Sequence, residues 1–483
     1  MERLSTSDLR KNHHLMWRAG FGPRLNDLDL LSTQSPESIW KKMLRDSEVA
    51  PVSIDVVTSD TLNTDATITK TQGSPESDRR RLARISRENI KLLNLSWVEQ
   101  MVTSKQQLRE KLSLFWHGHF AATSGNILHQ QKLIGIIRNN ALGNFSTLLK
   151  EVSKSASIIN YLSNNQNRKN RPNENFAREV MELFTMGHGN YSEKDIKEAA
   201  RAFTGWGATP SGEFVFRTRQ HDEGEKEFMG RTGNFDGDDI LNIILEQKQT
   251  ALFITRKIYR YFVNDTVNET NIRWLADRFF SSGYNISGLV TDLFQSDWFY
   301  ASGNMGNRIK SPVELIVGIR RILDLGIENK QVQLLLQRLL GQTLFYPPNV
   351  AGWPGGYNWI DSSSLMLRLQ IPGMIIDAAT VNLSPKDNDD QMMGMKDPVK
   401  PAIINKRIST QTIMAKTNWK DFLKVFETTR RERLAKQIAA LIVTPPLTDG
   451  QISTVSVANA ESRESFIKGT TVRLMCMPEY QLC

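Results

Sequence analysis

Helix signals recur along most of this chain of 483 residues, and they constrain its fold more than any other feature. Ser35 and Pro36 open one amphipathic segment as an N-cap and first helical residue. Ser192 opens another, with Asp195 in the position of a capping box. Strand signals are few, and the alternating stretch GEFVFRTRQ is typical of one strand of a hairpin. We therefore predict a predominantly α-helical protein, with a large single helical core, long polar loops and a small β-hairpin.

Polar stretches interrupt this helical pattern. Pro51–Asp78 and Asn382–Arg407 are poor in apolar residues, which is typical of long loops, insertions or linkers. Between them, YPPNVAGWPGGYNW is too rich in proline and glycine for a helix, but its tryptophans predict tight packing. We predict a main helical domain over residues 1–381. Residues 382–483 are predicted to be a linker or insertion and a C-terminal helical cap packed on that domain.

Composition narrows the function classes. The net charge of +9 favours anionic partners or substrates, but the basic residues are dispersed, so we do not expect nucleic-acid binding. No apolar stretch has the length of a membrane span, and no signal peptide is visible. The compartment is unknown: a cytoplasmic location is the default expectation and export is the alternative. Phosphate-binding and dinucleotide-binding glycine motifs are absent from the sequence, which disfavours nucleotide cofactors.

The stretch NRPNENFAREVMELFTMG carries three glutamates among apolar residues that are typical of a helix packed in a core. Asn173 is the predicted N-cap of a helix over residues 174–186. Helical spacing puts Glu174, Arg178 and Glu182 on one stripe, with Glu179 at the flank of Glu182. The stripe is either a carboxylate cluster facing a cleft or an ion-pair network in which Arg178 neutralises its neighbours.

Basic residues stand next to two predicted helix starts. Arg168 and Arg171 lie among asparagines before the glutamate-bearing helix, where they predict either an anion or sugar site or a polar surface loop. Lys310 precedes a helix that begins at Pro312. Glu314 lies in the first turn of that helix, where the helix dipole already accounts for a carboxylate.

Two histidine motifs are candidate metal or acid–base groups. FWHGHFAAT places His117 and His119 two positions apart, so on a helix they point in opposite directions, whereas at a helix end or in a loop they can share a metal. RQHDEGEKEFMG places His221, Asp222 and Lys226 in one glycine-containing loop. These three suit metal binding, anion binding or an oriented base. The alternative for both motifs is a set of histidines hydrogen-bonded to the backbone.

Several long blocks together resemble a known family. They occur in the order HHLMWRAGFGP, LFWHGHFAAT, NRPNENFAREVMELFTMGHGNYSEKDIKEAARAFTGW, HDEGEKEFMG, KSPVELIVG, FYPPNVAGWPGG and LMCMPEYQLC. This pattern resembles the bacterial family called domain of unknown function 1800, over nearly the whole chain from His13 to Cys483. Gly118 stands where the family pattern has an asparagine, which removes one polar group and eases the chain out of a helix.

The resemblance implies one assembled pocket, because the family pattern matches polar residues in several different helices and loops. The family is uncharacterised. Its genes look commonly paired with those of a sulfatase-like family, domain of unknown function 1501, so the resemblance also implies a sulfatase-like protein partner. Many relatives look exported, which leaves the location of this chain open.

Two functions follow as hypotheses. The first is a hydrolase-like or oxygenase-like enzyme on an anionic or carbohydrate-like substrate, with a cleft that works by acid–base chemistry or with a divalent metal as the candidate cofactor. The alternative is a non-catalytic scaffold or partner protein with buried ion-pair networks. The candidate residues are Glu174, Arg178, Glu182 and Lys226 for catalysis, Arg18, Arg168, Arg171 and Lys310 for substrate binding, and His117, His119, Glu179, His221 and Asp222 for a metal.

Overall fold

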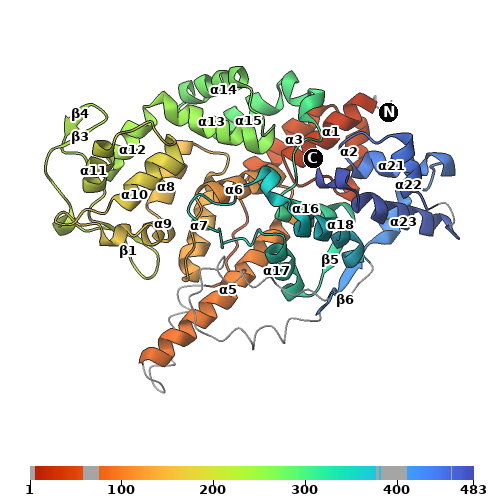
Figure 1. Ribbon diagram of the computed structural model, residues 1–483, viewed down its shortest axis with the longest axis horizontal. Coiled ribbons are helices and arrows are strands. Elements are labelled where there is room, and N and C mark those ends of the chain that lie inside the picture. Colours follow the sequence, from red (N-terminus) through yellow and green to blue (C-terminus); the bar gives the residue numbers. More distant parts are fainter. Residues whose placement is uncertain (1–5, 58–74, 377–379, 382–410, 458–459) are drawn as a thin grey trace.

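The computed structural model describes residues 6–57, 75–376, 380–381, 411–457 and 460–483. Over these residues the protein is predominantly α-helical, which confirms the predicted fold class (Figure 1). The helices of the first part of the chain are α1 (Thr6–Arg18), α2 (Leu28–Thr33), α3 (Pro36–Glu48), α5 (Pro75–Thr103), α6 (Gln107–His119), α7 (Ile127–Asn140), α8 (Phe145–Ser153), α9 (Ala156–Tyr161), α10 (Glu174–Glu179), the π-helix η3 (Val180–Thr185), α11 (Glu193–Ala202), α12 (Gly237–Leu245), α13 (Lys248–Phe262), α14 (Glu269–Ser281) and α15 (Ile286–Phe294).

The rest of the chain adds further helices and short 3-10 turns. The helices are α16 (Pro312–Ile322), α17 (Lys330–Leu339), α18 (Ser362–Ile376), α20 (Trp419–Lys424), α21 (Arg431–Ile442), α22 (Asp449–Val455) and α23 (Arg463–Met475). The 3-10 turns among the described residues are η1 (Leu25–Asp27), η2 (Asn164–Gln166), η4 (Thr218–Gln220), η5 (Asp297–Tyr300), η6 (Ser302–Asn304), η7 (Gly356–Trp359) and η8 (Pro478–Gln481).

Local capping signals explain where several helices begin. The Ser35 side chain accepts a hydrogen bond from the Ser38 amide, and Pro36 is the first residue of α3. Ser192 forms a capping box with Asp195 at the start of α11. Both starts were predicted, because a cap needs only the few residues around it.

Short pairs of antiparallel strands lie between the helices along the chain. The predicted hairpin is the pair β1 (Trp206–Ala208) and β2 (Phe214–Phe216), with Gly207 opposite Val215. The other pairs are β3 (Lys226–Phe228) with β4 (Arg231–Gly233), β5 (Leu325–Ile327) with β8 (Ala415–Thr417), and β6 (Thr380–Val381) with β7 (Gln411–Thr412). These other pairs were not predicted, since strands of two or three residues are too short for a period-two pattern to stand out.

Two hydrophobic clusters form the interior. The larger is built mainly from α1 to α15, and the second from α16, α17, α18, α21 and α23. Helix α16 joins them, because Val313 belongs to the first cluster and Leu315 to the second. Helix α6 lies in the middle of the molecule, and all its residues except Gly118 are buried (Figure 1). The polar side chains of α6 therefore need partners inside the protein.

The predicted polar stretches fall partly outside the described residues. Residues 58–74 and 382–410 are among those not described, so the predicted linker and most of the first loop are not tested here. The predicted end of that loop at Asp78 was wrong, because α5 begins at Pro75 and residues 75–78 are helical. The fixed φ of proline suits the first position of a helix. The division into residues 1–381 and 382–483 stays a prediction.

The proline-, glycine- and tryptophan-rich stretch packs against the C-terminal end of α6. The ring of Trp353 lies 5.6 Å from the ring of His117, and Trp359 is buried. Gly352 has a φ of +81°, and a Cβ atom there would come within 2.2 Å of the Gly118 carbonyl oxygen. Only glycine permits this close approach.

Among the described residues, no helix combines the length and the apolar character needed to cross a bilayer.

Candidate functional site

The stretch predicted as one helix consists of two kinds of helix, and we call its residues 174–185 the glutamate helix. Asn173 caps α10 by accepting a hydrogen bond from the Asn175 amide, as predicted. The chain then continues as the π-helix η3, where the Met186 amide donates to the Met181 carbonyl at 2.8 Å. A π-turn has more residues per turn than an α-helix. Side chains that follow Val180 are therefore displaced from the stripe that α-helical spacing predicts.

Arg178 pairs with two carboxylates, but on a different pattern from the predicted one. It donates to Glu174 at 3.3 Å and, through two nitrogens, to Glu193 of α11 at 2.9 and 2.8 Å. The side chains of Arg178 and Glu174 keep exposed fractions of 35% and 40%. The predicted ion pair of Arg178 with Glu174 is confirmed. Glu182, the other predicted neighbour, instead accepts a hydrogen bond from the Tyr191 hydroxyl at 2.9 Å.

Glu179 and Glu182 form a half-buried carboxylate pair beside two tyrosines. Burial raises the pKa of Glu179, and the neighbouring Glu182 carboxylate raises it further. The pKa of Tyr161 is raised by burial and by Glu179, so its hydroxyl stays protonated near that carboxylate. The pKa of Tyr191 is raised by burial and by its hydrogen bond to Glu182. The two carboxylates therefore have different surroundings on one face of the glutamate helix.

His117 is held inside an aromatic cluster. Its Nε2 atom accepts a hydrogen bond from the Phe345 amide at 3.1 Å, and its ring contacts Trp97 edge-on at 5.2 Å between centroids. Burial lowers the pKa of His117 to about 3, so the imidazole is neutral at physiological pH. Gly118 does not end the helix here, because α6 continues to His119.

His119 faces a different neighbour. Its Nε2 atom lies 3.1 Å from the Phe184 carbonyl oxygen, and its Nδ1 atom lies 3.1 Å from Lys257 Nζ. Lys257 also donates to the Leu183 carbonyl at 3.2 Å, and burial lowers its pKa to about 8. His119 and Lys257 thus bind carbonyl groups of the π-helix, which a helix end leaves without intrahelical partners.

The loop with His221, Asp222 and Lys226 folds on itself. His221 Nδ1 lies 2.9 Å from the Thr204 carbonyl oxygen, and Asp222 accepts two hydrogen bonds from Arg201 at 2.8 and 3.2 Å. Lys226 is buried and donates to the Asp222 and Gly224 carbonyl oxygens at 2.5 and 2.9 Å. Each of these groups therefore has a partner within this region that stabilises the loop.

The structure does not bring the five candidate metal ligands together. His117, His119 and His221 each have different partners, and the two histidines on α6 point away from each other, as helical spacing requires. In the part of the chain that the structure describes, no group of three or more histidine, cysteine, aspartate or glutamate side chains is arranged to hold a metal ion. Metal binding by these residues stays a prediction.

The candidate substrate-binding residues divide into two places. Arg168 and Arg171 are exposed and pair with each other across a tight turn before the glutamate helix, since the Arg171 amide donates to the Arg168 carbonyl at 2.8 Å. Arg18 and Lys310 are fully buried in the middle of the molecule. A substrate-binding role for all four stays a prediction.

Arg18 and Lys310 belong to a buried group of charges that we call the Glu314 cluster. Glu314 accepts hydrogen bonds from Lys111, from Arg308 at 2.9 Å and, on its other oxygen, from the Ser311 amide at 2.6 Å. Lys310 donates to the Tyr480 carbonyl at 2.6 Å, and its Nζ lies 3.7 Å from the centroid of a Trp17 ring. The cluster consists of Arg18, Lys111, Arg308, Lys310 and Glu314.

Burial and neighbouring charges have opposite effects on the pKa values of this cluster. It would raise the pKa of Glu314, but Arg308 and Lys111 outweigh it and hold that pKa well below its ordinary value. Burial lowers the pKa of Arg18 to about 10 and that of Lys310 to about 7. Glu314 and Cys483 both raise the pKa values of the four cationic side chains and so oppose the effect of burial on them. Each of these charges needs such a partner, because an unpaired charge in a dry environment is strongly destabilising.

Comparison with known proteins gives a family. The family described as "Protein of unknown function (DUF1800)" matches residues 14–482, nearly the whole chain. The chain belongs to this family. The predicted resemblance is thus confirmed, and the function of the family is unknown. Comparisons with curated proteins and with solved structures give no match.

Several residues at these DUF1800 sites were missed by sequence reasoning. Lys111 and Arg308, the partners of Glu314, were not singled out, and neither was Lys257, the partner of His119. One signal was available for Lys111: the charged run at residues 109–111 interrupts a helix that is apolar on several sides. A charge in such a helix has to find a partner in the core. Nothing comparable marks Lys257, whose helix is amphipathic.

Proposed function

We propose that the protein is an acid–base enzyme of the hydrolase type that uses Glu179 and Glu182 on a carbohydrate-like substrate. The observation that carries this proposal is the difference between two neighbouring carboxylates. Glu182 accepts a hydrogen bond from Tyr191, whereas burial and the Glu182 charge raise the pKa of Glu179. In glycoside hydrolysis, two neighbouring carboxyl groups with different surroundings divide the roles of acid and base.

Within this proposal, Glu179 is the general acid and Glu182 is the base or nucleophile. A carboxyl group with a raised pKa keeps its proton to higher pH and can give it to a leaving oxygen. The Tyr191 hydroxyl orients Glu182 and stays protonated, since its own pKa is raised. The π-turn supports this assignment, because π-turns occur frequently at functional sites.

The surroundings of the pair support the substrate class. Tyr161 and Tyr191 offer aromatic rings and neutral hydroxyl groups, which suit a ligand rich in hydroxyls. The exposed Arg168 and Arg171 precede the same helix and would bind an acidic group of the substrate. An anionic sugar polymer thus fits both the pair and the basic loop.

The test uses the purified protein and a panel of neutral and acidic oligosaccharides, with release of reducing ends as the readout. We expect Glu179→Gln and Glu182→Gln to lower the rate by about 10²–10⁴-fold while far-UV circular dichroism stays unchanged. The rate should fall as the pH rises above the raised pKa of Glu179, because the acid loses its proton there. Glu179→Gln should remove that pH dependence.

The matched control is Glu246→Gln, which changes a glutamate of the same size in an exposed ion pair with Arg231. This variant should keep the wild-type rate. Folded Glu179→Gln and Glu182→Gln proteins with wild-type turnover would rule out the proposed acid–base pair. A wild-type protein that neither cleaves nor binds any member of the panel would rule out the substrate class.

A second candidate is a non-catalytic protein that works with a sulfatase-like partner of the family called domain of unknown function 1501. One observation favours it: Tyr357, in the proline- and glycine-rich stretch, has an exposed fraction of 79%. Tyrosine is enriched among the anchor residues of protein interfaces. Loss of co-purification with such a partner in the Tyr357→Ser variant would support this candidate. Unchanged co-purification would show that Tyr357 does not form the contact.

A further inference from the structure

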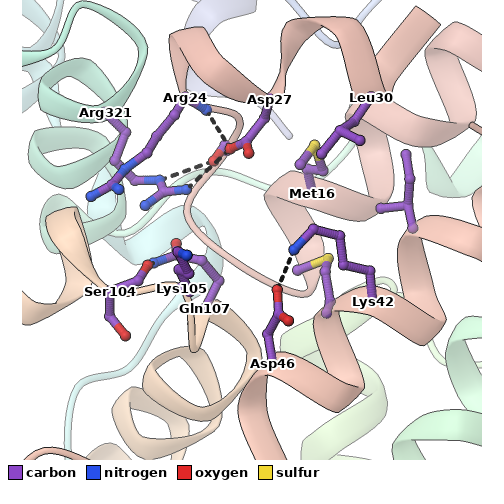
Figure 2. Close-up of a pocket in the computed structure, with 13 residues that line it drawn as sticks. Met16, Arg24, Asp27, Leu30, Lys42, Asp46, Ser104, Lys105, Gln107 and Arg321 are labelled. Carbon is purple, nitrogen blue, oxygen red and sulfur yellow. Dashed lines mark hydrogen bonds and ion pairs between the residues drawn. The ribbon is translucent and has the colours of Figure 1, made fainter. Parts of the chain in front are cut away.

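A pocket far from the glutamate helix lies where α1, α3, the end of α5 and α16 meet (Figure 2). Its cavity volume is about 80 Å³, which is several times the roughly 10–15 Å³ that a cavity needs to hold one water molecule. One side of the cavity is apolar. It is formed by Met16, Leu30, Ile39 and Met43. A purely inorganic ion would leave this side without a matching surface.

The other side of the pocket is rich in positive charge. Arg24 and Arg321 both donate to the Val102 carbonyl oxygen, which brings the two guanidinium groups close together. Asp27 faces both: its carboxylate accepts from the Arg24 amide at 2.9 Å and lies 3.8 Å from Arg321 (Figure 2). Lys42 pairs with Asp46 at a second edge. Lys105 is exposed at the mouth.

These charges do not balance among the lining residues. Four of those side chains are cationic and two are acidic, which leaves a net charge of +2. The side chain of Arg321 has an exposed fraction of 3%, and burial lowers its pKa to about 9, with Arg24 lowering it further. Asp27 offsets part of this repulsion at both arginines, and Asp324 and Glu99 also raise the pKa of Arg24. An anion placed beside the two guanidinium groups would offset more of it.

A purely structural role, the capping of a helix C-terminus, accounts for part of the arrangement. The Val102 carbonyl lies in the last turn of α5, and cations at a helix C-terminus satisfy such carbonyl groups and the helix dipole. The Gly22 carbonyl accepts a further hydrogen bond from Arg321 at 3.0 Å, so backbone carbonyl groups hold both guanidinium groups. This role does not account for Lys105 or for the apolar wall opposite.

We propose that this pocket binds a small organic carboxylate. Its carboxylate group lies beside Arg24 and Arg321, where the positive charge of both guanidinium groups attracts it. Its short alkyl chain lies against the methionine and leucine side chains opposite. The cavity volume limits the chain to a few carbon atoms. This site is separate from the proposed carboxylate pair and does not depend on it.

Isothermal titration calorimetry with a series of sodium carboxylates from acetate to octanoate tests the proposal. We expect dissociation constants on the order of 1 mM for propionate and butyrate, weaker binding of acetate, and loss of binding at octanoate. Butylamine has the same alkyl chain and the opposite charge, and it should not bind. Inorganic phosphate should bind at least tenfold more weakly than butyrate.

Two variants test the two sides of the pocket. Leu30→Trp fills the apolar side, and Lys105→Glu reverses a charge at the exposed mouth without touching the core. Each should weaken butyrate binding by tenfold or more. The matched control is Lys248→Glu, which reverses an exposed lysine that does not line the pocket. It should bind butyrate as the wild type does.

Three results would overturn the proposal. They are no binding of any carboxylate at 100 mM or so, phosphate binding as tight as butyrate binding, and unchanged butyrate binding by the Lys105→Glu protein. If Leu30→Trp does not fold, Lys105→Glu and the chain-length series still decide the outcome.

Oligosaccharide cleavage is measured separately from carboxylate binding. A negative binding result therefore does not bear on the proposed roles of Glu179 and Glu182, and a negative cleavage result does not bear on this pocket.

Discussion

The Glu314 cluster and the glutamate helix use the same chemical groups in opposite surroundings. In the cluster, the paired side chains of Lys111 and Glu314 have exposed fractions of 1% and 0%. In the glutamate helix, Arg178 and Glu174 have exposed fractions of 35% and 40%. Figure 1 shows α6 and α16 in the middle of the molecule, whereas α10 lies towards one end. Burial, and not residue type, separates the two regions.

The difference teaches what each region is suited to do. Buried charges have lost their water, so they hold one another tightly and stabilise a single arrangement of helices. Half-buried carboxylates keep access to solvent and to a ligand, and Glu179 and Glu182 can therefore exchange protons. Both regions contain candidate residues from the sequence, but of the two regions only the glutamate helix keeps them partly exposed.

Glu314→Gln should have the largest effect on stability. The change leaves Lys111 and Arg308 buried beside a neutral amide, so we expect the free energy of unfolding to fall by roughly 3–5 kcal/mol. Urea denaturation followed by tryptophan fluorescence measures it. Glu269→Gln, at an exposed pair with Arg256, is the matched control and should leave the midpoint nearly unchanged. Equal losses in the two variants would contradict the comparison.

Lys310 should give the protein an unusual pH dependence. Burial lowers its folded pKa from 10.5 to about 7, so between these values the unfolded chain binds more protons than the folded one. Stability should therefore rise with pH across this window, by roughly 1–4 kcal/mol between pH 7 and 10. Denaturation at several pH values, with Lys310→Met as the reference that lacks this proton, measures the rise. Parallel curves for both proteins would show that Lys310 does not titrate in this way.

Glu174→Gln should have the smallest effect. It removes one partly exposed ion pair of Arg178, which keeps its contacts with Glu193, and we expect a loss of roughly 0.3–0.5 kcal/mol. The loss should shrink further in 1 M salt, because solvent-exposed pairs are screened. A loss above 2 kcal/mol that is insensitive to salt would place this pair with the buried ones.

Much of the fold follows from local patterns. The caps at Ser35, Asn173 and Ser192, the hairpin at β1 and β2, and the predominance of helices were all predictable, since each depends on neighbours in the chain. The π-turn was not predictable, because its hydrogen bonds shift by one residue without any change in the apolar pattern. Nor was the pairing of Glu182 with Tyr191, while Arg178 binds Glu174 and Glu193.

The candidate sites depended more on tertiary structure than on any local pattern. The chain's own residue order sets the helices, their starts and the membership of the DUF1800 family. Packing alone decided that Lys111 meets Glu314, 203 positions away, and that His117 and His119 have separate partners. The physical reason is the distance along the chain over which each interaction acts. Capping and helix periodicity act over a few residues, whereas the pairing of buried charges depends on which helices the core brings together.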